Sequence, residues 1–128
     1  MIVEWICRYG DINYVGSDST AMEQGSASHR EIQKIHKEHF PDYKREVALS
    51  TVAVCDDFEI TISGRADGVY SNENGIWVEE IKCSLVSLDY LYSQYLVHKA
   101  QAMFYAYMYA KKNEMTEPIN TVIVYYSL

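Results

Sequence analysis

Several features are scarce in this chain of 128 residues, and each scarcity excludes a class of protein. The three cysteines, Cys7, Cys55 and Cys83, are an odd number at wide spacing, so they indicate neither a disulfide framework nor a CxxC metal motif. No apolar run is long enough to span a membrane, and residues 1–7 are too short for a signal peptide and already contain Glu4. We therefore expect a protein of the reducing cytoplasm with no membrane partner.

Positive charge is also scarce. The chain has 11 lysines and arginines against 18 acidic residues, and its formal net charge is −7. This balance argues against a protein that grips nucleic acid over a broad basic surface. It does not exclude a nuclease, because a site rich in carboxylates is acidic until its metal binds. Tight binding of DNA would then come from elsewhere, such as a neighbouring domain.

The composition is otherwise that of an ordinary globular protein, with 48% hydrophobic and 23% charged residues. The length suffices for a single domain with a core, over residues 1–128. No internal repeat, low-complexity tract or linker divides the chain. Its last residues follow an apolar strand pattern, which we interpret as a domain cut from a longer protein.

Hydrophobic periodicity predicts an α/β protein with the element order α-β-β-β-α-β. Residues 3–9 have the pattern of a short helix and residues 11–19 that of a loop. Turn signals lie at residues 56–57 and 71–75, and residues 85–97 read as a loop that becomes helical near its end. The main elements are expected to be helices over about 21–39 and 98–112, and strands over 46–55, 58–65, 76–84 and 119–127.

The first long helix has a clear start signal and an unusual interior. Thr20-Ala21-Met22-Glu23 has the form of a capping box, in which the threonine hydroxyl and the glutamate satisfy free amides. Gly25 lies inside this helix, where glycine costs about 1 kcal/mol relative to alanine. We expect Gly25 to permit the close approach of another backbone or side chain.

The most informative pattern is Asp67, within the run GRADG, followed by Glu80-Ile81-Lys82. Side chains alternate between the two faces of a strand, so Glu80 and Lys82 point one way and Ile81 the other. If the preceding strand carries Asp67 to the same end of the sheet, two carboxylates and an ammonium converge. Two carboxylates can hold Mg²⁺ or Mn²⁺ and leave positions for water and phosphate oxygens. The alternative is a solvated sheet face with a weak cross-strand pair.

Two pairs of residues on the predicted helices support a site of this kind. Gly25 and His29 lie four residues apart on the first helix, and a neutral imidazole can complete a metal shell, suiting Mn²⁺ or Fe²⁺ better than Mg²⁺. Gln101 and Tyr105 share one face of the later helix. The glutamine can position water or a phosphate, and the tyrosine can donate to a phosphate or stack on a base.

Competing assignments remain open for these residues. His36 shares the helix face of His29 and is a second candidate ligand, while either histidine is also explained as a surface or core residue. Glu79 rivals Glu80, but it lies on the opposite strand face and breaks the spacing to Lys82. Tyr105 is also explained as part of the core, where we expect Met103, Tyr107 and Met108.

Taken in order, these motifs resemble those of the PD-(D/E)xK nuclease superfamily, in the RecB-like branch that includes the CRISPR-associated exonucleases and the nuclease modules of recombination helicases. The resemblance covers about residues 21–128. The runs AMEQGSASHREIQ, GRADG and EEIK look most similar to the N-terminal nuclease module of DinG-like helicases. The matching positions are Gly25 with His29, Gly64 with Asp67, Glu80 with Lys82, and Gln101 with Tyr105.

The resemblance implies a restriction-endonuclease-like core, with a central mixed sheet flanked by helices. It also implies a DNA exonuclease of DNA repair that needs Mg²⁺ or Mn²⁺. Asp67, Glu80, His29 and the backbone carbonyl of Ile81 would hold the metal. Lys82 would orient or deprotonate the attacking water, so that Asp67, Glu80 and Lys82 form the catalytic set.

Further expectations concern the substrate and the partners. By the same resemblance, Gln101 and Tyr105 would bind substrate, which is single-stranded or end-bearing DNA, and a helicase domain or subunit would be the partner. Glu46 could support the metal ligands from behind. Relatives often carry four cysteines for an iron–sulfur cluster, and this chain lacks them, so we expect no such cluster within it. A non-catalytic nucleic-acid-binding domain and a hydrolase of another phosphate ester remain alternatives.

Overall fold

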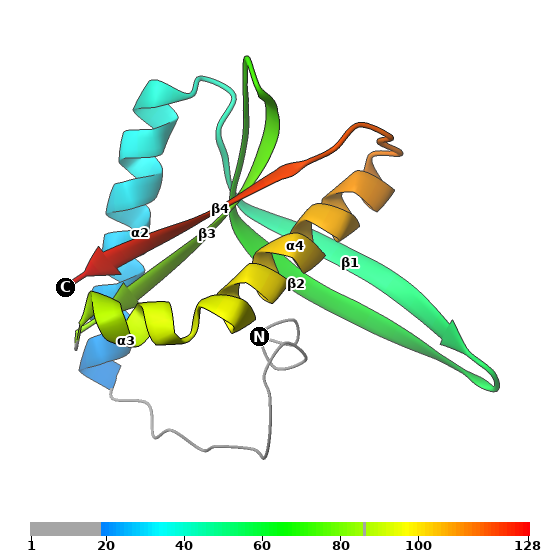
Figure 1. Cartoon of the computed structure of the whole chain (residues 1–128), viewed down its shortest axis with the longest axis horizontal. Helices are drawn as coiled ribbons and strands as arrows, with labels where there is room; N and C mark the ends of the chain where they lie inside the picture. Colours follow the sequence, from blue (N-terminus) through cyan, green and yellow to red (C-terminus); the bar gives the residue numbers. More distant parts are fainter. Residues whose placement is uncertain (1–18, 86) are drawn as a thin grey trace.

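The computed structural model describes residues 19–85 and 87–128, and the side chains of residues 19–22 are outside the description. The expected short helix at 3–9 and most of the loop that follows it lie outside the described residues, and so does the side chain of Thr20. Figure 1 shows the arrangement of the described elements. They are α2 (Ser19–His39), β1 (Lys44–Cys55), β2 (Phe58–Asn72), β3 (Gly75–Ser84), α3 (Leu88–Ser93), α4 (Tyr95–Lys112) and β4 (Asn120–Ser127).

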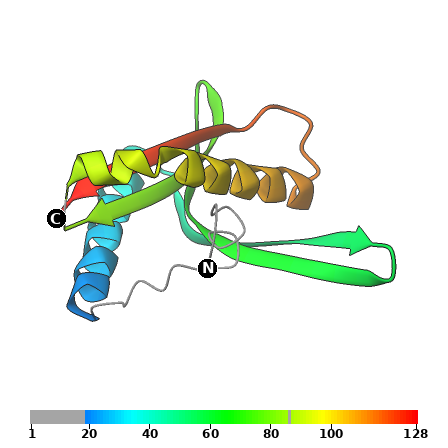
Figure 2. The same ribbon diagram turned by 60° about the horizontal axis from the view of Figure 1, so that its bottom comes forward.

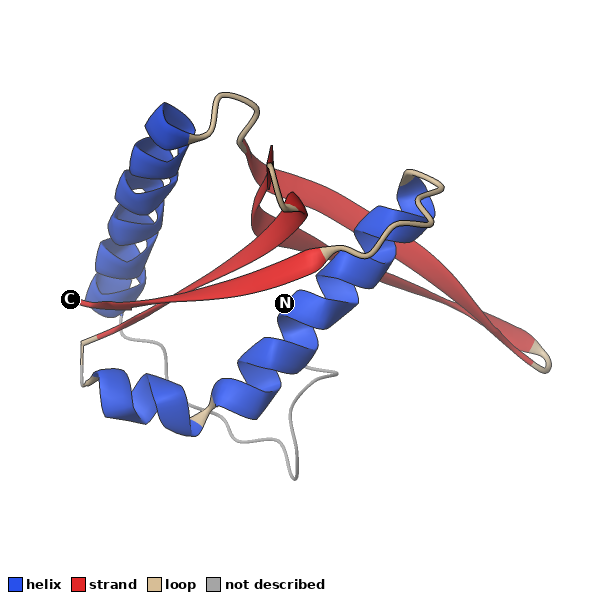
Figure 3. Ribbon diagram, turned by 45° about the horizontal axis from the view of Figure 1, so that its top comes forward, coloured by secondary structure: helices blue, strands red, loops and turns tan. Residues whose placement is uncertain are grey.

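The four strands form one mixed sheet in the order β1-β2-β3-β4. The strand pairs β1–β2 and β2–β3 are antiparallel, whereas β3 and β4 run parallel. A parallel pair needs a long crossover, which α3 and α4 supply here. Figure 3 shows helices on both sides of the strands. The predicted α/β class, with a mixed sheet flanked by helices, is therefore confirmed.

One helix was missed in the segment that separates β3 from α4. This segment was expected to be a loop that turns helical near its end, but α3 occupies Leu88–Ser93. Ser87 caps α3, since its hydroxyl accepts a hydrogen bond from the Tyr90 amide at 3.1 Å. The structure thus places two helices, rather than one, between the last two strands.

The second strand is longer than the sequence pattern suggested, and this changes the place of Asp67. β2 runs to Asn72, past the predicted end at Arg65, and the following turn is confined to Glu73 and Asn74. Asp67 therefore lies within a strand rather than after one.

The sheet opens between β2 and β3. Their ladder pairs Asn72 with Gly75 at one end and ends with the pair Gly68–Glu79 at the other. Beyond that pair, β2 continues against β1 into a long hairpin, and β3 continues against β4. Figures 1 and 2 show the hairpin projecting away from the β3–β4 pair. The residues next to the opening are Asp67 on β2 and Glu80 on β3.

The two flanking helices approach opposite faces of the sheet. α4 packs on the face that carries the apolar core, and α2 reaches the other face of β2 and β3, where Gln33 and His36 make their contacts. The core of the described residues joins the sheet to α4 through Leu49, Ala66, Val69, Val78, Tyr105, Ala106 and Met108.

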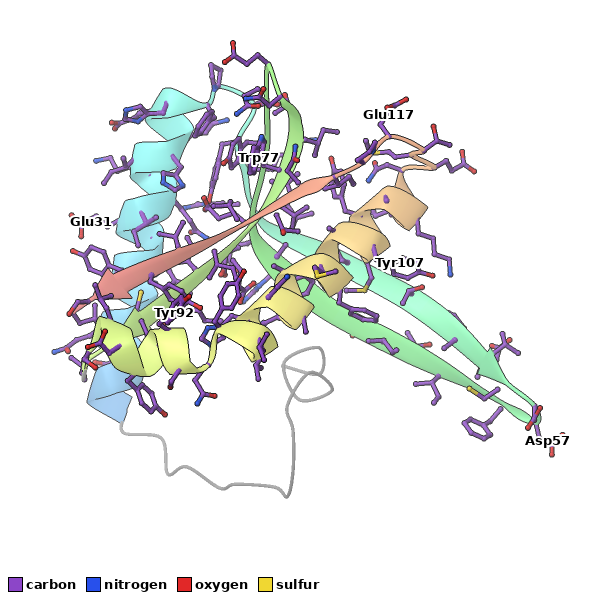
Figure 4. The ribbon with its side chains drawn as sticks, in the orientation of Figure 1. Glu31, Asp57, Trp77, Tyr92, Tyr107 and Glu117 are labelled. Atoms are coloured by element: carbon purple, nitrogen blue, oxygen red, sulfur yellow. The ribbon has the colours of Figure 1, made fainter. Side chains whose placement is uncertain are left out.

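Two predictions about α4 were wrong and one was confirmed. Met108 is fully buried, as expected for a core residue. Met103 and Tyr107 are instead about half exposed, at 54% and 53%, and Figure 4 labels Tyr107 on α4. α4 is apolar on most of its surface, so apolar residue type alone did not distinguish its buried stripe.

The expected role of Gly25 is not supported. A Cβ built on this residue would have no described atom within 4 Å, so no close neighbour among the described residues requires glycine there. Gly68, on β2, does have such a neighbour, since a Cβ would lie 2.3 Å from the hydroxyl oxygen of Tyr43. Within the described part of the chain, no helix is long and apolar enough to cross a membrane.

Candidate active site

A cavity of about 720 Å³ lies at the opening between β2 and β3. Six of the side chains predicted for the site line it together, and they come from α2, β2, β3 and α4. The lining residues are Ser26, His29, Arg30, Gln33, Arg45, Glu46, Arg65, Asp67, Glu80, Lys82, Gln101 and Tyr105. Folding thus brings His29 and Tyr105, which are 76 positions apart in the sequence, to one cavity, as the sequence motifs predicted.

Asp67 is held at the point where the β2–β3 ladder ends. Its Oδ2 accepts a hydrogen bond from the Ile81 amide at 2.7 Å, so the carboxylate satisfies an amide that has lost its strand partner on that side. Its other oxygen, Oδ1, lies 3.6 Å from Nδ1 of His29. The neighbouring carboxylate of Asp67 raises the pKa of His29 above its ordinary value, against the opposing effect of burial. The ring of His29 is thereby directed toward Asp67.

The backbone of Ile81 is placed beside Asp67 by its amide. The side chain of Ile81 is fully buried, on the strand face opposite Glu80 and Lys82, as alternation predicts. The suggestion that the Ile81 carbonyl is a metal ligand stays a prediction.

Glu80 and Lys82 form the second half of the site. Lys82 Nζ lies 2.8 Å from Oε1 of Glu80, whose side chain is almost completely buried. The other oxygen, Oε2, is buried without a hydrogen-bond partner among the described residues. Burial raises the pKa of Glu80 to about 7, although the nearby ammonium of Lys82 favours the charged form. A cation beside this oxygen would compensate a charge that the protein itself compensates only in part.

Gln101 and Tyr105 form the wall of the cavity on the α4 side. Both are buried, and Oε1 of Gln101 has no hydrogen-bond partner among the described residues. The ring of Tyr105 belongs to the apolar core, while the same side chain, which ends in a hydroxyl, also lines the cavity with Gln101. Burial raises the pKa of this hydroxyl. The two explanations of Tyr105, core residue and cavity residue, therefore hold for different ends of one side chain.

The rival candidates, His36 and Glu79, pair with each other outside this cavity. Nδ1 of His36 lies 2.7 Å from Oε2 of Glu79, and the Tyr43 hydroxyl donates to Oε1 of the same carboxylate at 2.6 Å. Burial raises the pKa of Glu79, and its two partners oppose that effect. Neither His36 nor Glu79 lines the cavity that contains Glu80. The structure thus groups His29 with Asp67, and His36 with Glu79.

Two residues that support Asp67 were missed or only weakly indicated. Gln33 is buried and its Nε2 donates to the carbonyl oxygen of Asp67 and to Oε1 of Glu46, both at 2.9 Å. Glu46 has a φ of 55°, and the β1–β2 register passes over it between the pairs Arg45–Gly68 and Val47–Ala66. A left-handed glutamate inside a strand is strained, and such strain is concentrated at functional sites. No sequence signal identified Gln33.

A preformed metal cluster is not seen. Across residues 19–85 and 87–128, no three His, Cys, Asp or Glu side chains are grouped in the way that a metal site requires. His29, Asp67 and Glu80 nevertheless line one cavity, and Nδ1 of His29 lies 3.6 Å from Oδ1 of Asp67. The unpartnered Oε2 of Glu80 is the atom that fits a cation best.

Comparison with known proteins supports the fold alone. No family model and no curated protein matches this chain. Among solved structures, the chain is similar to the crystal structure of SSO0001, with 23% sequence identity and a TM-score of 0.57. The match covers 80% of this chain and 45% of SSO0001, so the chain spans less than half the length of that protein.

Proposed function

We propose that this chain is a divalent-metal-dependent DNA nuclease of the PD-(D/E)xK type whose motifs it resembles. The carrying observation is that Asp67, Glu80 and Lys82 line a single cavity with His29, and that a buried oxygen of Glu80 there has no described partner. The proposed reaction is phosphodiester hydrolysis on single-stranded or end-bearing DNA by an exonuclease of the reducing cytoplasm, coupled to a helicase domain or subunit in DNA repair.

Asp67, Glu80 and His29 would hold Mg²⁺ or Mn²⁺, with the Ile81 carbonyl as a fourth donor. When bound, the cation supplies Lewis-acid polarisation of the phosphate and lowers the pKa of a bound water. The fit is chemical, since two carboxylates suit either ion and an imidazole suits Mn²⁺ better. Holding the ion would require Glu80 to be charged, and a neighbouring cation favours that form.

The remaining side chains would act on the substrate and on protons. Lys82, 2.8 Å from Glu80, would orient the attacking water or accept its proton. Gln101 offers a buried carbonyl oxygen and a side-chain amide to water or to a phosphate, and Tyr105 offers its hydroxyl. Gln33 would act through Asp67 by fixing its backbone carbonyl at 2.9 Å.

A non-catalytic nucleic-acid-binding domain is the second candidate. The observation that favours it is the pairing of Lys82 with Glu80 and of Asp67 with the Ile81 amide, because both contacts occupy groups that catalysis needs. This candidate predicts binding of DNA that is indifferent to divalent metal. It also predicts that no hydrolysis is detected under any metal.

Hydrolysis of a labelled single-stranded oligodeoxynucleotide tests the proposal. Wild-type protein is assayed with Mn²⁺, with Mg²⁺ and with EDTA, beside Lys82→Ala and the matched variant Lys34→Ala, which removes an exposed lysine on α2 that does not line the cavity. We expect metal-dependent cleavage by wild type and by Lys34→Ala, and at least a hundredfold loss in Lys82→Ala, as is typical for removal of a proton-transfer group. Equal cleavage by Lys82→Ala and wild type would refute the proposal. A panel of nucleotide phosphate esters, assayed in parallel, separates DNA from other substrates.

A further inference from the structure

The arginines of this protein are distributed unevenly. Arg30 on α2, Arg45 on β1 and Arg65 on β2 are the arginines of residues 19–85 and 87–128, and all of them line the cavity described above. They come from separate elements that meet at the opening of the sheet. All are exposed, so their guanidinium groups lie at the rim of the cavity, whereas Glu80 and Gln101 lie buried within it. We call these residues the arginine rim.

The rim reverses the charge of the molecule locally. The chain as a whole has a formal net charge of −7. The cavity lining, in contrast, carries four cationic side chains, the arginine rim and Lys82, against the carboxylates of Glu46, Asp67 and Glu80. A positive rim around an acidic interior attracts an anion to one place on an otherwise repulsive surface.

Two of the rim residues are available for a ligand. The side chains of Arg30 and Arg45 form no ion pair or hydrogen bond with any described residue, whereas Arg65 Nε lies 2.6 Å from Oε2 of Glu46. That pair is exposed, with 67% of Arg65 and 37% of Glu46 accessible, so solvent screens it. Arg65 can therefore exchange Glu46 for a stronger anionic partner at small cost.

The residue type also points to phosphate. A guanidinium presents a planar fork of donors that binds phosphate oxygens in pairs, which an ammonium cannot do. Lysines are more common than arginines in this chain, yet the cavity has three arginines and one lysine, Lys82, already paired with Glu80. Arg30 and Arg45 are not among the positions that match the family motifs, and Arg65 lies within the run GRADG.

We infer that the arginine rim binds backbone phosphates of single-stranded DNA, on the α2 and hairpin side of the cavity, next to the phosphate that would be cleaved. That the ligand is DNA rests on the proposed function, whereas binding of phosphate by the arginine rim does not. It supplies the affinity that a chain of this net charge otherwise lacks. Gln101 and Tyr105 then contact the strand from the opposite, α4 wall.

Binding in the presence of EDTA tests the inference without any cleavage. Fluorescence anisotropy measures the affinity for a labelled single-stranded oligodeoxynucleotide at several salt concentrations. The test variant is Arg30→Gln/Arg45→Gln. The matched control is Lys34→Gln/Lys44→Gln, which removes the same charge from the same two elements at exposed positions that do not line the cavity. Urea unfolding of each variant verifies that it is folded.

The expected result is a change in salt dependence that is confined to the rim variant. Each phosphate contact on a single strand contributes about −0.7 to the slope of log affinity against log salt, so two lost contacts make the slope shallower by about 1.4. Between 50 and 200 mM salt, wild type should therefore lose about sevenfold more affinity than the rim variant does. Arg30→Lys/Arg45→Lys should recover the slope but not the full affinity, because the forked contacts are lost.

Equal effects in the rim and control variants, no effect in either, or a wild type that does not bind in EDTA would each overturn the inference. Cleavage by wild type with an unchanged slope in the rim variant would leave the proposed function standing and remove only the rim. A rim-dependent slope in a protein that cleaves nothing would support the rim and reject the nuclease.

Discussion

The buried carboxylate of Glu80 should lower the stability of the protein at neutral pH, and Glu80→Gln tests this. Burial raises the pKa of Glu80 from 4.5 to about 7. The folded state therefore holds this proton more tightly than the unfolded state does, and stability falls as the pH rises from about 4.5 to about 7 and is level above it. The difference corresponds to about 3 kcal/mol above pH 7, as an upper bound for a group paired with Lys82.

Glutamine stays neutral and keeps a carbonyl oxygen that can accept from Lys82. We expect Glu80→Gln to unfold at a higher urea concentration than wild type at pH 8, and to match it near pH 4.5, with EDTA present throughout. Glu31→Gln, at an exposed position on α2 labelled in Figure 4, is the control that changes the same charge without burial. The stabilised variant should lose hydrolysis, since function and stability are opposed at such a site. If the variant is less stable than wild type at pH 8, or if the stability gap does not change with pH, burial of a charged Glu80 does not lower the stability of the protein.

Three further outcomes are expected. Gly25→Ala should stabilise the protein by up to about 1 kcal/mol in urea unfolding, since helix propensity improves without a clash. Gly68→Ala should destabilise it by about 1–3 kcal/mol, because the added methyl group would clash with Tyr43. The reverse order of stabilities would contradict the described packing. Gln33→Ala should cost about 1–3 kcal/mol and lower the cleavage rate, because the part-buried carbonyl of Asp67 loses its donor; wild-type rates would exclude a positioning role. Glu79→Gln should retain hydrolysis in the oligonucleotide assay, because Glu79 does not line the cavity, and loss of hydrolysis with the fold intact would reverse the assignment.

The sequence predicted the order of the strands along the chain and six side chains that line one cavity, because both depend largely on simple periodicity. Alternation along β3 separated Glu80 and Lys82 from Glu79, and the structure shows the two glutamates in different surroundings. Spacing of four residues placed Gln101 beside Tyr105 on one face of α4. These are local relations that a chain segment carries without its partners.

Features that depend on contacts between distant segments were not predictable in this way. Gln33 became important because α2 lies against β2 and β3, which brings its amide to Asp67 and to Glu46 on the neighbouring β1. The burial of Met103 was predicted wrongly, since the covered side of an apolar helix is decided by the sheet it meets. The opening between β2 and β3, which creates the cavity, has no signal in either strand.

The arginine rim also depends on contacts between distant segments, so the sequence did not predict it. Its members, Arg30, Arg45 and Arg65, are scattered over 36 positions and form no motif, and the net charge of −7 argued against a basic surface. Folding collects them at one cavity. The net charge of the whole chain therefore did not indicate the local positive charge at the cavity.

Anomalous diffraction from crystals soaked in Mn²⁺ is the decisive test of the proposed metal site. We predict a peak between the carboxylates of Asp67 and Glu80, with an imidazole nitrogen of His29 within coordination reach, and no such peak in crystals of Asp67→Asn. A soaked crystal with no ion at this position, or with the Mn²⁺ bound elsewhere while these three side chains point apart, would contradict it.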